Sequence, residues 1–393
     1  MKKDLIYLDN AATTRISGNV LEAMMPWLTE GYGNASSMYT SGRQSAIALS
    51  KARESCAASL GCEPREIYFT SGGSESDNWA IRSAAAVMAQ KGKRHIICSA
   101  FEHHAVLNPL ETLKKQGFEI TYLPVYENGI VKPEDVSAAL REDTALVSVM
   151  YVNNEIGTVQ PISEIGALCR ERGVLFHTDA VQAAGNAEID VSGQNIDMLS
   201  LSGHKIHAMK GTGLLYVKSS VPLIPLIEGG AQERGRRAGT ENIAGIVGLA
   251  KALEEASGGV SEKNARLLPL REKLIERISA IEGTRLNGDR ERRIAANVNF
   301  SFAGIEGEAL MLQLDLKGIA VSSGSACTSG SLDPSHVILA LGRSRDEARG
   351  SLRITMSEYT TEEETDRLIE ELIPITEKLR SMSPLWQRMK GAL

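Results

Sequence analysis

The chain has 393 residues, of which 42% are hydrophobic and 23% are charged. A chain of this length and ordinary globular composition has room for about two or three folded domains, so a disordered polypeptide and a disulfide mini-scaffold are excluded. Its formal net charge of −6 argues against a broad electrostatic affinity for nucleic acid or for an anionic membrane surface.

Seven short apolar runs in the first part of the chain are typical of β-strands. They lie at residues 66–70, 95–99, 119–124, 145–152, 174–178, 197–201 and 213–217. Helix-like segments separate most of them, which indicates a mainly parallel sheet covered by helices. We therefore predict an α/β protein whose large domain contains a mainly parallel, seven-stranded sheet.

The pattern changes at residues 253–260, where the segment EEASGG predicts a hinge. Beyond it we expect a helix, a strand, a helix, a strand and a helix, at residues 265–282, 295–302, 307–317, 351–356 and 361–380. That order predicts a smaller α+β domain. We assign residues 16–256 to the large domain, 257–393 to the small domain, and 1–15 to an N-terminal arm that joins the small domain.

The cysteines are odd in number, scattered, and without a C-x-x-C pair, which favours reduced thiols over a disulfide framework. They are Cys56, Cys62, Cys98, Cys169 and Cys327. The first residues lack the apolar region of a secretory signal, and no run of about 18 apolar residues predicts a membrane span. We therefore expect a cytoplasmic protein.

Polar residues follow five of the predicted strands, at the carboxyl ends where open α/β sheets bind ligands. The first such segment, SGGSES at residues 71–76, is a glycine turn that leads into a helix, where free N–H groups favour an anion such as phosphate. The alternative is a helix cap without a ligand, because Ser74 and Asp77 both suit a helix N-terminus. The chain has neither G-x-x-x-x-G-K-[ST] nor G-x-G-x-x-G, which argues against ATP and dinucleotides.

The remaining strand ends carry a lysine and an aspartate that are informative as a pair. A pyridoxal 5′-phosphate (PLP) site needs a lysine amine for a Schiff base, a carboxylate to keep the pyridine nitrogen protonated, and phosphate donors. Lys205 and Asp179 supply the first two, although each alone suits a loop lysine or a helix cap. The other polar residues at these ends are Glu102, His103, His104, Asn153, Asn154, Glu155, Gln182, Ser202, Gly203 and His204.

The histidines divide into one candidate and several structural ones. His103 directly follows a strand, where its ring is placed to stack on an aromatic cofactor, whereas His104 and His177 are interpreted as structural. His204 and His207 form an H-x-x-H without further ligands, so no metal site is predicted.

Cys327 lies in SSGSACTSGS, ten small residues at 322–331 without a large apolar side chain. A free cysteine is usually a small buried hydrophobe, and Cys56, Cys98 and Cys169 fit that description. The sequence around Cys327 has few apolar residues that could bury its side chain. An exposed thiol on a glycine- and serine-rich loop suits a nucleophile that must travel.

Taken together, these residues resemble the group I cysteine desulfurases, in the class V aminotransferase branch of the fold-type I PLP enzymes. The resemblance runs from YLDNAATT at 7–14 to SPLW at 383–386, essentially the whole chain. Its most specific segments are residues 69–78, NNEIGTVQPI at 153–162, HTDAVQAAG at 177–185, 202–205, RAGTEN at 237–242 and SSGSACTS at 322–329.

The resemblance implies a role for each candidate residue. Lys205 is expected to carry PLP, His103 to stack on its ring, Asp179 to pair with the ring nitrogen, Gln182 to reach the phenolate oxygen, and Asn154 to lie near that oxygen and the substrate. The expected phosphate cup is Gly73, Ser74, Ser202 and His204, completed by Thr240 of a neighbouring subunit. Arg353 is expected to anchor the substrate carboxylate with help from Asn34, and Cys327 to accept the sulfur.

Three segments depart from the usual pattern. His207-Ala208-Met209 stands where H-G-P is usual, Ala35 and Tyr39 replace a usual Pro and His near Asn34, and Ser357-Glu358 stands where a Gly is common after Arg353. These departures concern substrate fit and rate rather than PLP binding.

The resemblance implies a homodimeric PLP enzyme that converts L-cysteine to L-alanine and holds the sulfur as a persulfide on Cys327. An acceptor protein of iron–sulfur cluster assembly or tRNA thiolation is expected to take the sulfur, with no direct nucleic-acid or membrane partner. Selenocysteine lysis and a C–S β-lyase reaction, which do not need Cys327, are rival reactions. A scaffold for a sulfur-accepting partner is a rival of another class, and it would need none of Lys205, Asp179 and Cys327.

Overall fold

A computed structural model of the chain describes residues 5–323 and 333–391, so Cys327 lies outside the described residues. Its largest sheet has seven strands in the order β2-β8-β7-β6-β5-β3-β4 and is parallel except where β8 pairs with β2 and β7. The strands are β2 (Ile67–Thr70), β3 (His95–Ser99), β4 (Glu119–Leu123), β5 (Thr144–Ser148), β6 (Leu175–Asp179), β7 (Met198–Ser202) and β8 (Gly213–Val217). The predicted mainly parallel, seven-stranded sheet is confirmed.

Only β5 departs from its predicted bounds by more than one residue, because it ends at Ser148 rather than at residue 152. The chain nevertheless stays beside β6, since the backbone N–H groups of Val149 and Tyr151 donate to the carbonyls of His177 and Asp179. The extended segment therefore continues toward the site, as its apolar sequence indicates.

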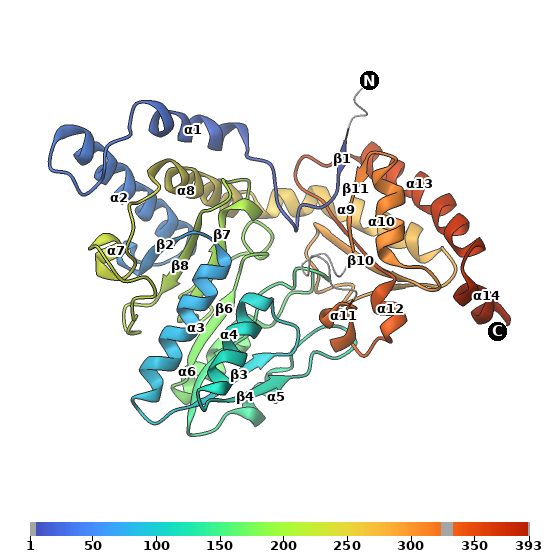
Figure 1. The fold of residues 1–393 in the computed structure, drawn as a ribbon, viewed down its shortest axis with the longest axis horizontal. Coiled ribbons are helices and arrows are strands. Elements are labelled where there is room, and N and C mark those ends of the chain that lie inside the picture. Colours follow the sequence, from blue (N-terminus) through green and yellow to red (C-terminus); the bar gives the residue numbers. More distant parts are fainter. Residues whose placement is uncertain (1–4, 324–332, 392–393) are drawn as a thin grey trace.

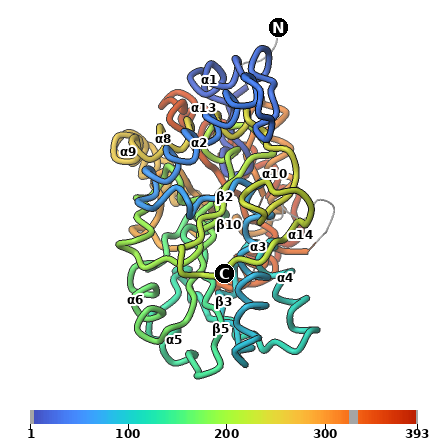
Figure 2. The backbone as a smooth tube through the Cα atoms, turned by 90° about the vertical axis from the view of Figure 1, so that its left-hand side faces the viewer, coloured from blue at the N-terminus to red at the C-terminus, as the bar shows by residue number. Residues whose placement is uncertain are grey.

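Helices cover both faces of this sheet (Figure 1). Alternate strand residues point to opposite faces: Ile96 and Leu146 pack with Trp79, whereas Ile97 and Val147 belong to a second buried cluster. The helices of this part are α1 (Gly18–Thr29), α2 (Thr40–Leu60), α3 (Gly73–Ala89), α4 (His104–Lys115), α5 (Pro133–Ala139), α6 (Ile162–Arg172), α7 (Gln232–Gly235) and α8 (Ile243–Gly258), with short 3₁₀ turns η1 (Pro64–Glu66) and η2 (Gly203–Lys205). Figures 1 and 2 both place α1, α2 and α8 together in the upper part of the view, and α5 and α6 in the lower part.

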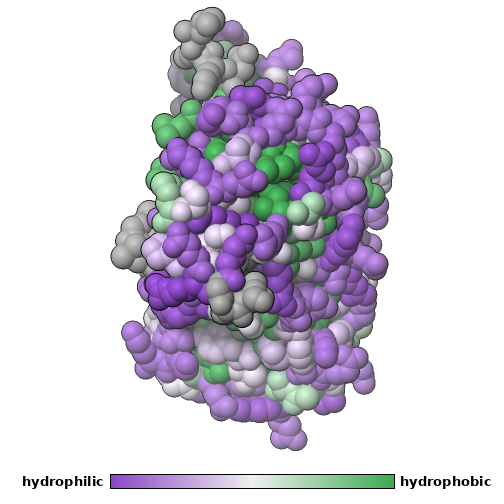
Figure 3. Space-filling view, turned by 90° about the vertical axis from the view of Figure 1, so that its right-hand side faces the viewer, coloured by the Kyte–Doolittle hydropathy of each residue, from purple (hydrophilic) through white to green (hydrophobic). Residues whose placement is uncertain are grey.

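A second, antiparallel sheet has the order β12-β13-β10-β9. Its strands are β9 (Thr284–Leu286), β10 (Asn297–Phe302), β12 (Ser322–Ser323) and β13 (Ser351–Thr355), and its helices are α9 (Val260–Ser279), α10 (Gly307–Asp315), α11 (His336–Ala340), α12 (Arg345–Arg349), α13 (Glu362–Ser381) and α14 (Pro384–Gly391). The face that carries α13 and α14 is largely hydrophilic, with small hydrophobic groups between the charged side chains (Figure 3). None of the described helices is long and apolar enough to span a membrane.

The segment predicted as a hinge is helical. Helix α8 continues through Glu254, Glu255 and Ala256 to Gly258, and only Gly259 separates it from α9. Glutamate and alanine are strong helix formers, so the helix extends through the segment until the glycines end it. The proposed boundaries between the domains remain predictions.

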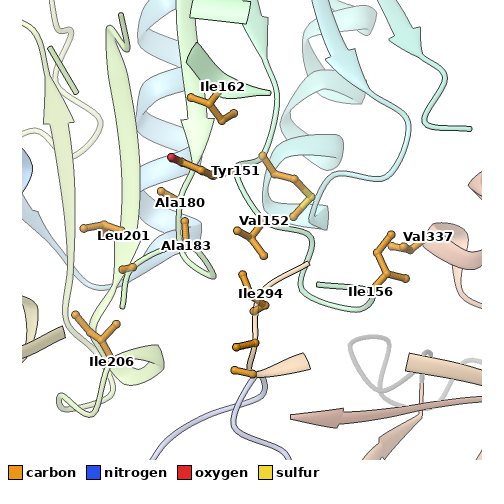
Figure 4. Close-up of a cluster of buried hydrophobic side chains, with 14 of the residues drawn as sticks. Tyr151, Val152, Ile156, Ile162, Ala180, Ala183, Leu201, Ile206, Ile294 and Val337 are labelled. Carbon is orange, nitrogen blue, oxygen red and sulfur yellow. The ribbon is translucent and has the colours of Figure 1, made fainter. Parts of the chain in front are cut away.

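The N-terminal segment crosses from one sheet to the other. β1 (Ile6–Tyr7) pairs in parallel with β11 (Ile319–Ala320), Asp9 forms a β-bridge with Thr355, and the chain then passes to α1 beside the large sheet (Figure 1). An apolar layer also joins the two parts: Ile156 lies next to Val337, and Ile294 lies next to Val152 (Figure 4). The two sheets therefore share one continuous core.

Candidate active site

A cavity of about 350 Å³ lies at the carboxyl ends of the parallel strands. It brings together residues that are far apart in sequence, from Ala11 to Arg353. The predicted site residues that line it are Gly73, Ser74, His103, Asn154, Asp179, Gln182, Ser202, His204, Lys205 and Arg353. The volume suits a small-molecule ligand.

The cavity ends at the first turn of α3. The residue that precedes this helix is Gly72, with φ 153°, and no side chain caps the helix N-terminus. A Cβ on Gly73 would lie 2.7 Å from Cγ2 of Val181, so glycine lets the helix start lie this close to Val181. Neither Ser74 nor Asp77 caps α3, so the side-chain cap on which the alternative interpretation depends is not formed. The uncapped N–H groups and helix dipole suit a phosphate.

Lys205 follows β7 at the end of η2. Its Nζ donates to the backbone carbonyl oxygens of Ala11 and Ala12, at 2.6 and 2.7 Å. The amine is therefore held in the cavity by the N-terminal segment rather than by the large sheet alone. These two acceptors could not be predicted from the sequence, because any residue supplies a backbone carbonyl.

Two buried aspartates lie near Lys205. Burial raises the pKa of Asp179 to about 6, against the opposing effects of the Val181 N–H group at 2.9 Å and of the charge on Lys205. Burial, reinforced by the charge on Asp179, raises the pKa of Asp77 well above its usual value. In the described part of the chain, Oδ1 of Asp77 has no hydrogen-bond partner. A ligand with a protonated ring nitrogen would compensate the buried negative charge of Asp179.

Asp77 is a site residue that the sequence interpretation missed. It lines the cavity four residues after Gly73, one helical turn further along α3. A spacing of four residues places Gly73 and Asp77 on the same face of the helix, and this spacing is the sequence signal that could have identified Asp77 as a site residue.

His103 precedes α4, and its Nδ1 accepts a hydrogen bond from the N–H group of Ala105 at 3.1 Å. Burial, with the nearby charges of His104 and Lys205, lowers the pKa of His103 to about 4. The ring is therefore neutral at physiological pH, and it borders the cavity as the stacking role requires.

The other two histidines of this region have structural contacts. The ring of His104 lies edge-on to that of His336, with centroids 4.7 Å apart. His177 is bonded to Ser148 and Ser200 at 2.9 and 3.0 Å, and burial lowers its pKa to about 3. Both contacts agree with the structural interpretation of these side chains.

Arg353 reaches the cavity from β13 of the smaller sheet. One amino group donates to Oδ1 of Asp9 and the other to the carbonyl oxygen of Asn154, both at 2.9 Å. Its buried Nε has no hydrogen-bond partner among the described residues. The guanidinium is thus held at the cavity, and its Nε can still donate a hydrogen bond, as a group that binds a carboxylate requires.

Two of the predicted residues that the structure describes do not line this cavity. Asn34 and Thr240 are exposed and do not line it within one chain. Cys327 lies outside the described residues.

The class-V aminotransferase family matches residues 6–368. The chain belongs to this family. It is 53% identical to "Cysteine desulfurase IscS" of Methanosarcina thermophila, over 97% of this chain and 94% of that protein. It is 50% identical to "Cysteine desulfurase" of Nostoc sp., over 97% of this chain and 95% of that protein.

Solved structures agree with this assignment. A structure described as a "NIFS-LIKE PROTEIN" has a TM-score of 0.90 and 38% identity, and the alignment covers 95% of this chain and 100% of that one. Another, "SspA in complex with cysteine", has a TM-score of 0.80 and 38% identity, with 90% and 99% coverage. The predicted PLP fold type I is confirmed.

Enzymes of this family use PLP, and the cavity fits that cofactor. Glycine at 73 lets the first turn of α3 lie against Val181, where a Cβ would collide, and this turn lines the cavity together with the hydroxyl groups of Ser74 and Ser202 as a phosphate site requires. The unpartnered carboxyl oxygen of Asp77 beside Asp179 marks an environment short of positive charge, which suits a pyridinium.

Proposed function

We propose that this chain is a PLP-dependent cysteine desulfurase that converts L-cysteine to L-alanine and passes the sulfur on as a persulfide of Cys327. The observation that carries the proposal is one cavity that joins Lys205, Asp179 and Arg353 in a class-V aminotransferase. The relatives named cysteine desulfurase at about half identity support the choice of reaction.

The cavity residues divide the binding of PLP between them. Lys205 would hold the aldehyde carbon, and the first turn of α3 with Ser74, Ser202 and His204 would hold the phosphate. Asp179 would pair with the ring nitrogen, and His103 would lie against the ring. Gln182 and Asn154 would approach the phenolate oxygen.

Bound PLP supplies an electron sink for the electron pair left when a proton leaves the substrate Cα. Nζ of Lys205 is the base that removes that proton, and the carbonyl oxygens of Ala11 and Ala12 keep it within the cavity. Asp179 would hold the ring nitrogen of PLP in its protonated form, which the electron sink requires. His103 is neutral at physiological pH, so its Nε2 is available for proton transfer near the substrate sulfur.

Arg353 binds the substrate carboxylate. Its contacts with Asp9 and with the Asn154 carbonyl fix the plane of the guanidinium before substrate arrives, which lowers the entropic cost of binding. The assistance expected from Asn34 stays a prediction.

The described cysteines are unsuited to accept sulfur. Burial raises the pKa of Cys56, Cys62 and Cys169 to about 12, and that of Cys98 well above its usual value, so all four are thiols at neutral pH. None of them lines the cavity. Their exclusion supports Cys327 as the acceptor.

The active unit is a homodimer. Helices α1 and α2 and the loop between them expose a group of large apolar side chains, which a second copy would cover: Leu21, Met25, Leu28, Tyr32, Met38, Tyr39 and Ile47. Thr240, exposed and away from its own cavity, is available to complete the phosphate site of the neighbouring subunit.

The four described cysteines are unbonded, which supports a cytoplasmic location where thiols stay reduced. The persulfide sulfur would pass there to an acceptor protein of iron–sulfur cluster assembly or tRNA thiolation.

The test is incubation of the PLP-loaded protein with L-cysteine. We expect alanine, and added sulfur on the peptide that carries Cys327. Cys327→Ser should keep the colour of bound PLP and its spectral change with cysteine, yet form almost no alanine, because a hydroxyl is a far weaker nucleophile than a thiolate.

Cys62→Ser is the matched control, since it removes a half-buried thiol away from the cavity, and it should retain activity. Undiminished alanine formation by Cys327→Ser would instead favour a lyase or elimination reaction. A wild-type protein that stays colourless after addition of PLP would overturn the cofactor assignment.

A further inference from the structure

An ion pair lies at the first turn of α3, where the cofactor phosphate is proposed to bind. Glu75 directly follows Ser74, and its carboxylate pairs with the guanidinium of Arg237. Nε of Arg237 donates to Oε1 of Glu75 at 2.9 Å, and Nη2 donates to Oε2 at 3.2 Å. Neither side chain lines the cavity, so the pair acts on the phosphate site from its border.

Glu75 is a carboxylate anion at neutral pH. Burial opposes its ionisation, but the hydrogen bonds from Arg237 and Ser71 outweigh burial and lower the pKa of Glu75. Oε2 also accepts the backbone N–H group of Ser71 at 2.8 Å, which holds the carboxylate over the turn that precedes α3. A negative charge at this place suits the helix dipole, so Glu75 stabilises the helix in its own right.

The same charge opposes a phosphate. A phosphate monoester carries between about one and two negative charges at neutral pH, and it would bind at the helix terminus that Glu75 already occupies. Two anions in one helix turn repel each other, most strongly where water is partly excluded. The side chains of Glu75 and Arg237 are only 11% and 22% exposed, so solvent screens this repulsion poorly. A cation paired with Glu75 therefore decides whether the turn accepts a second anion.

The titratable side chains that line the cavity do not supply this cation. They are Asp77, His103, Asp179, His204, Lys205 and Arg353. Lys205 stabilises the charge on Asp179, and Arg353 pairs with Asp9. Burial lowers the pKa of His103 and of His204 to about 4 and raises that of Asp77 well above its usual value, so these three groups are neutral at physiological pH.

Arg237 is the one cation paired with Glu75 in the described part of the chain, and its own segment holds it in place. It forms a β-bridge with Ile227, and its Nη1 donates to the carbonyl oxygen of Ala238 at 3.2 Å. Glu233, the other carboxylate whose charge acts on Arg237, pairs with Arg53 at 2.7 Å. The charge of Arg237 is therefore directed to Glu75.

We propose that Arg237 is a positioning residue for the cofactor phosphate: by pairing with Glu75 it cancels the negative charge in the first turn of α3, so that this turn can bind a second anion. The pair also keeps the carboxylate on the Ser71 N–H group and leaves the next N–H groups of the turn to the phosphate. The inference rests on the phosphate site of the proposed function, and it assigns that site a residue that does not touch the ligand.

The test compares PLP with pyridoxal, which has the same ring and aldehyde but no phosphate. Absorbance titration of the cofactor-free protein gives a dissociation constant for each ligand. In Arg237→Met the constant for PLP should rise about tenfold, because the charge of Glu75 is no longer cancelled. The constant for pyridoxal should stay that of the wild type. An equal loss for both ligands would show that Arg237 only supports the fold, and would overturn the proposal.

Glu75→Gln provides a rescue. Its carboxamide oxygen can still accept the Ser71 N–H group, but it carries no charge for Arg237 to cancel. The double variant Glu75→Gln with Arg237→Met should therefore bind PLP as tightly as Glu75→Gln alone. A double variant that binds PLP as weakly as Arg237→Met would overturn the proposal, because the loss would then not come from the charge of Glu75.

Arg237→Lys keeps the positive charge and loses the two-point contact, so it should bind PLP within about threefold of the wild type. It decides the charge argument even if Arg237→Met fails to fold: binding by Arg237→Lys at least about tenfold weaker than that of the wild type would overturn it. Arg141→Met is the matched control, because it breaks an exposed ion pair with Glu119 that does not line the cavity. It should bind both ligands as the wild type does.

The affinities also separate this inference from the proposed function. Wild-type protein that binds PLP but forms no alanine from L-cysteine would refute the proposed reaction, while the rescue by Glu75→Gln would still decide the role of Arg237. Wild-type protein that binds neither PLP nor pyridoxal would overturn the cofactor assignment and this inference together.

Discussion

Asp77 and Asp179 share one buried environment at the cavity that Lys205 also lines, and burial favours the protonated form of each carboxyl. Lys205 and the Val181 N–H group stabilise the charge on Asp179, whereas Oδ1 of Asp77 lacks a hydrogen-bond partner in the described part of the chain. The proton therefore belongs to Asp77. Its carboxylic acid leaves Asp179 as the anion that would pair with the ring nitrogen of PLP.

Asp77→Asn tests this assignment through stability. The pKa of Asp77 is higher in the folded protein than in the unfolded chain, so its contribution to the free energy of unfolding falls as pH rises above the unfolded pKa. Asparagine does not titrate, so it makes no pH-dependent contribution to the free energy of unfolding. As pH rises, the free energy of unfolding of the variant should therefore grow relative to that of the wild type, by up to about 1.4 kcal/mol per pH unit. Urea unfolding of the cofactor-free proteins at several pH values measures it.

The control is Glu171→Gln, which changes an exposed carboxyl on α6. Its stability difference from the wild type should not depend on pH in this way. A difference between Asp77→Asn and the wild type that is constant with pH would show that Asp77 is ionised in the folded protein.

At the residue scale, side chains at strand ends could be predicted from the sequence, and backbone partners could not. Lys205, Asp179 and His103 each follow a strand directly, and the structure places all three at the cavity. The acceptors at Ala11 and Ala12 act through carbonyl oxygens that every residue has. Asp77 was missed because an acidic residue near a helix start usually caps it, whereas Gly72 leaves α3 uncapped.

Among the elements, helix α3 has an N-terminus that packs closely against neighbouring residues. Its first residue, Gly73, packs against Val181, and the preceding Gly72 packs against Gly213, where a Cβ would lie 2.5 Å from the Gly72 Cα. The helix N-terminus is thus pressed against the large sheet while its N–H groups stay open to the cavity.

Gly73→Ala should weaken PLP binding. The added methyl group would lie 2.7 Å from Val181, so the first turn of α3 must shift and its N–H groups lose their alignment with the phosphate. We expect the dissociation constant for PLP to rise about tenfold, equivalent to about 1.4 kcal/mol, with activity restored by excess PLP. Absorbance titration of the cofactor-free protein measures it.

Gly258→Ala is the control, because a Cβ there meets no atom within 4 Å. It should bind PLP as the wild type does. Equal affinity of Gly73→Ala and wild type would refute the phosphate cradle at α3.

Long periodic elements could be predicted from the sequence, and the shortest ones could not. β1, β11 and β12 each have two residues, which is too short for any alternation, and they exist because distant segments pair with them. Their pairing depends on tertiary contacts that composition does not encode.

At the scale of the whole molecule, α1, α2 and their loop form an uncovered apolar surface. Met38 and Tyr32 are 91% and 84% exposed. Sedimentation of the wild type should therefore give twice the mass of one chain.

Met38→Glu should dissociate the dimer, because it would bury an unpaired charge in the interface. PLP affinity should fall with it, since Thr240 would no longer reach the neighbouring site. Leu312→Glu, which changes a side chain on α10 that is 57% exposed, should leave the dimer intact. A wild-type monomer with full activity would contradict the dimer proposal.

The N-terminal segment also sets the order in which the site is assembled during synthesis. Ala11 donates its N–H group to Thr355, 344 positions later in the chain, and Ile6 pairs with Ile319. The ribosome therefore completes the large sheet and Lys205 long before the partners of this segment exist. Contacts of such sequence separation form slowly, so we expect the pairing of this segment with Ile319 and Thr355 to be completed after the large sheet. In a newly made chain, the two carbonyl acceptors of Lys205 would then reach their final positions after the sheet that carries the lysine.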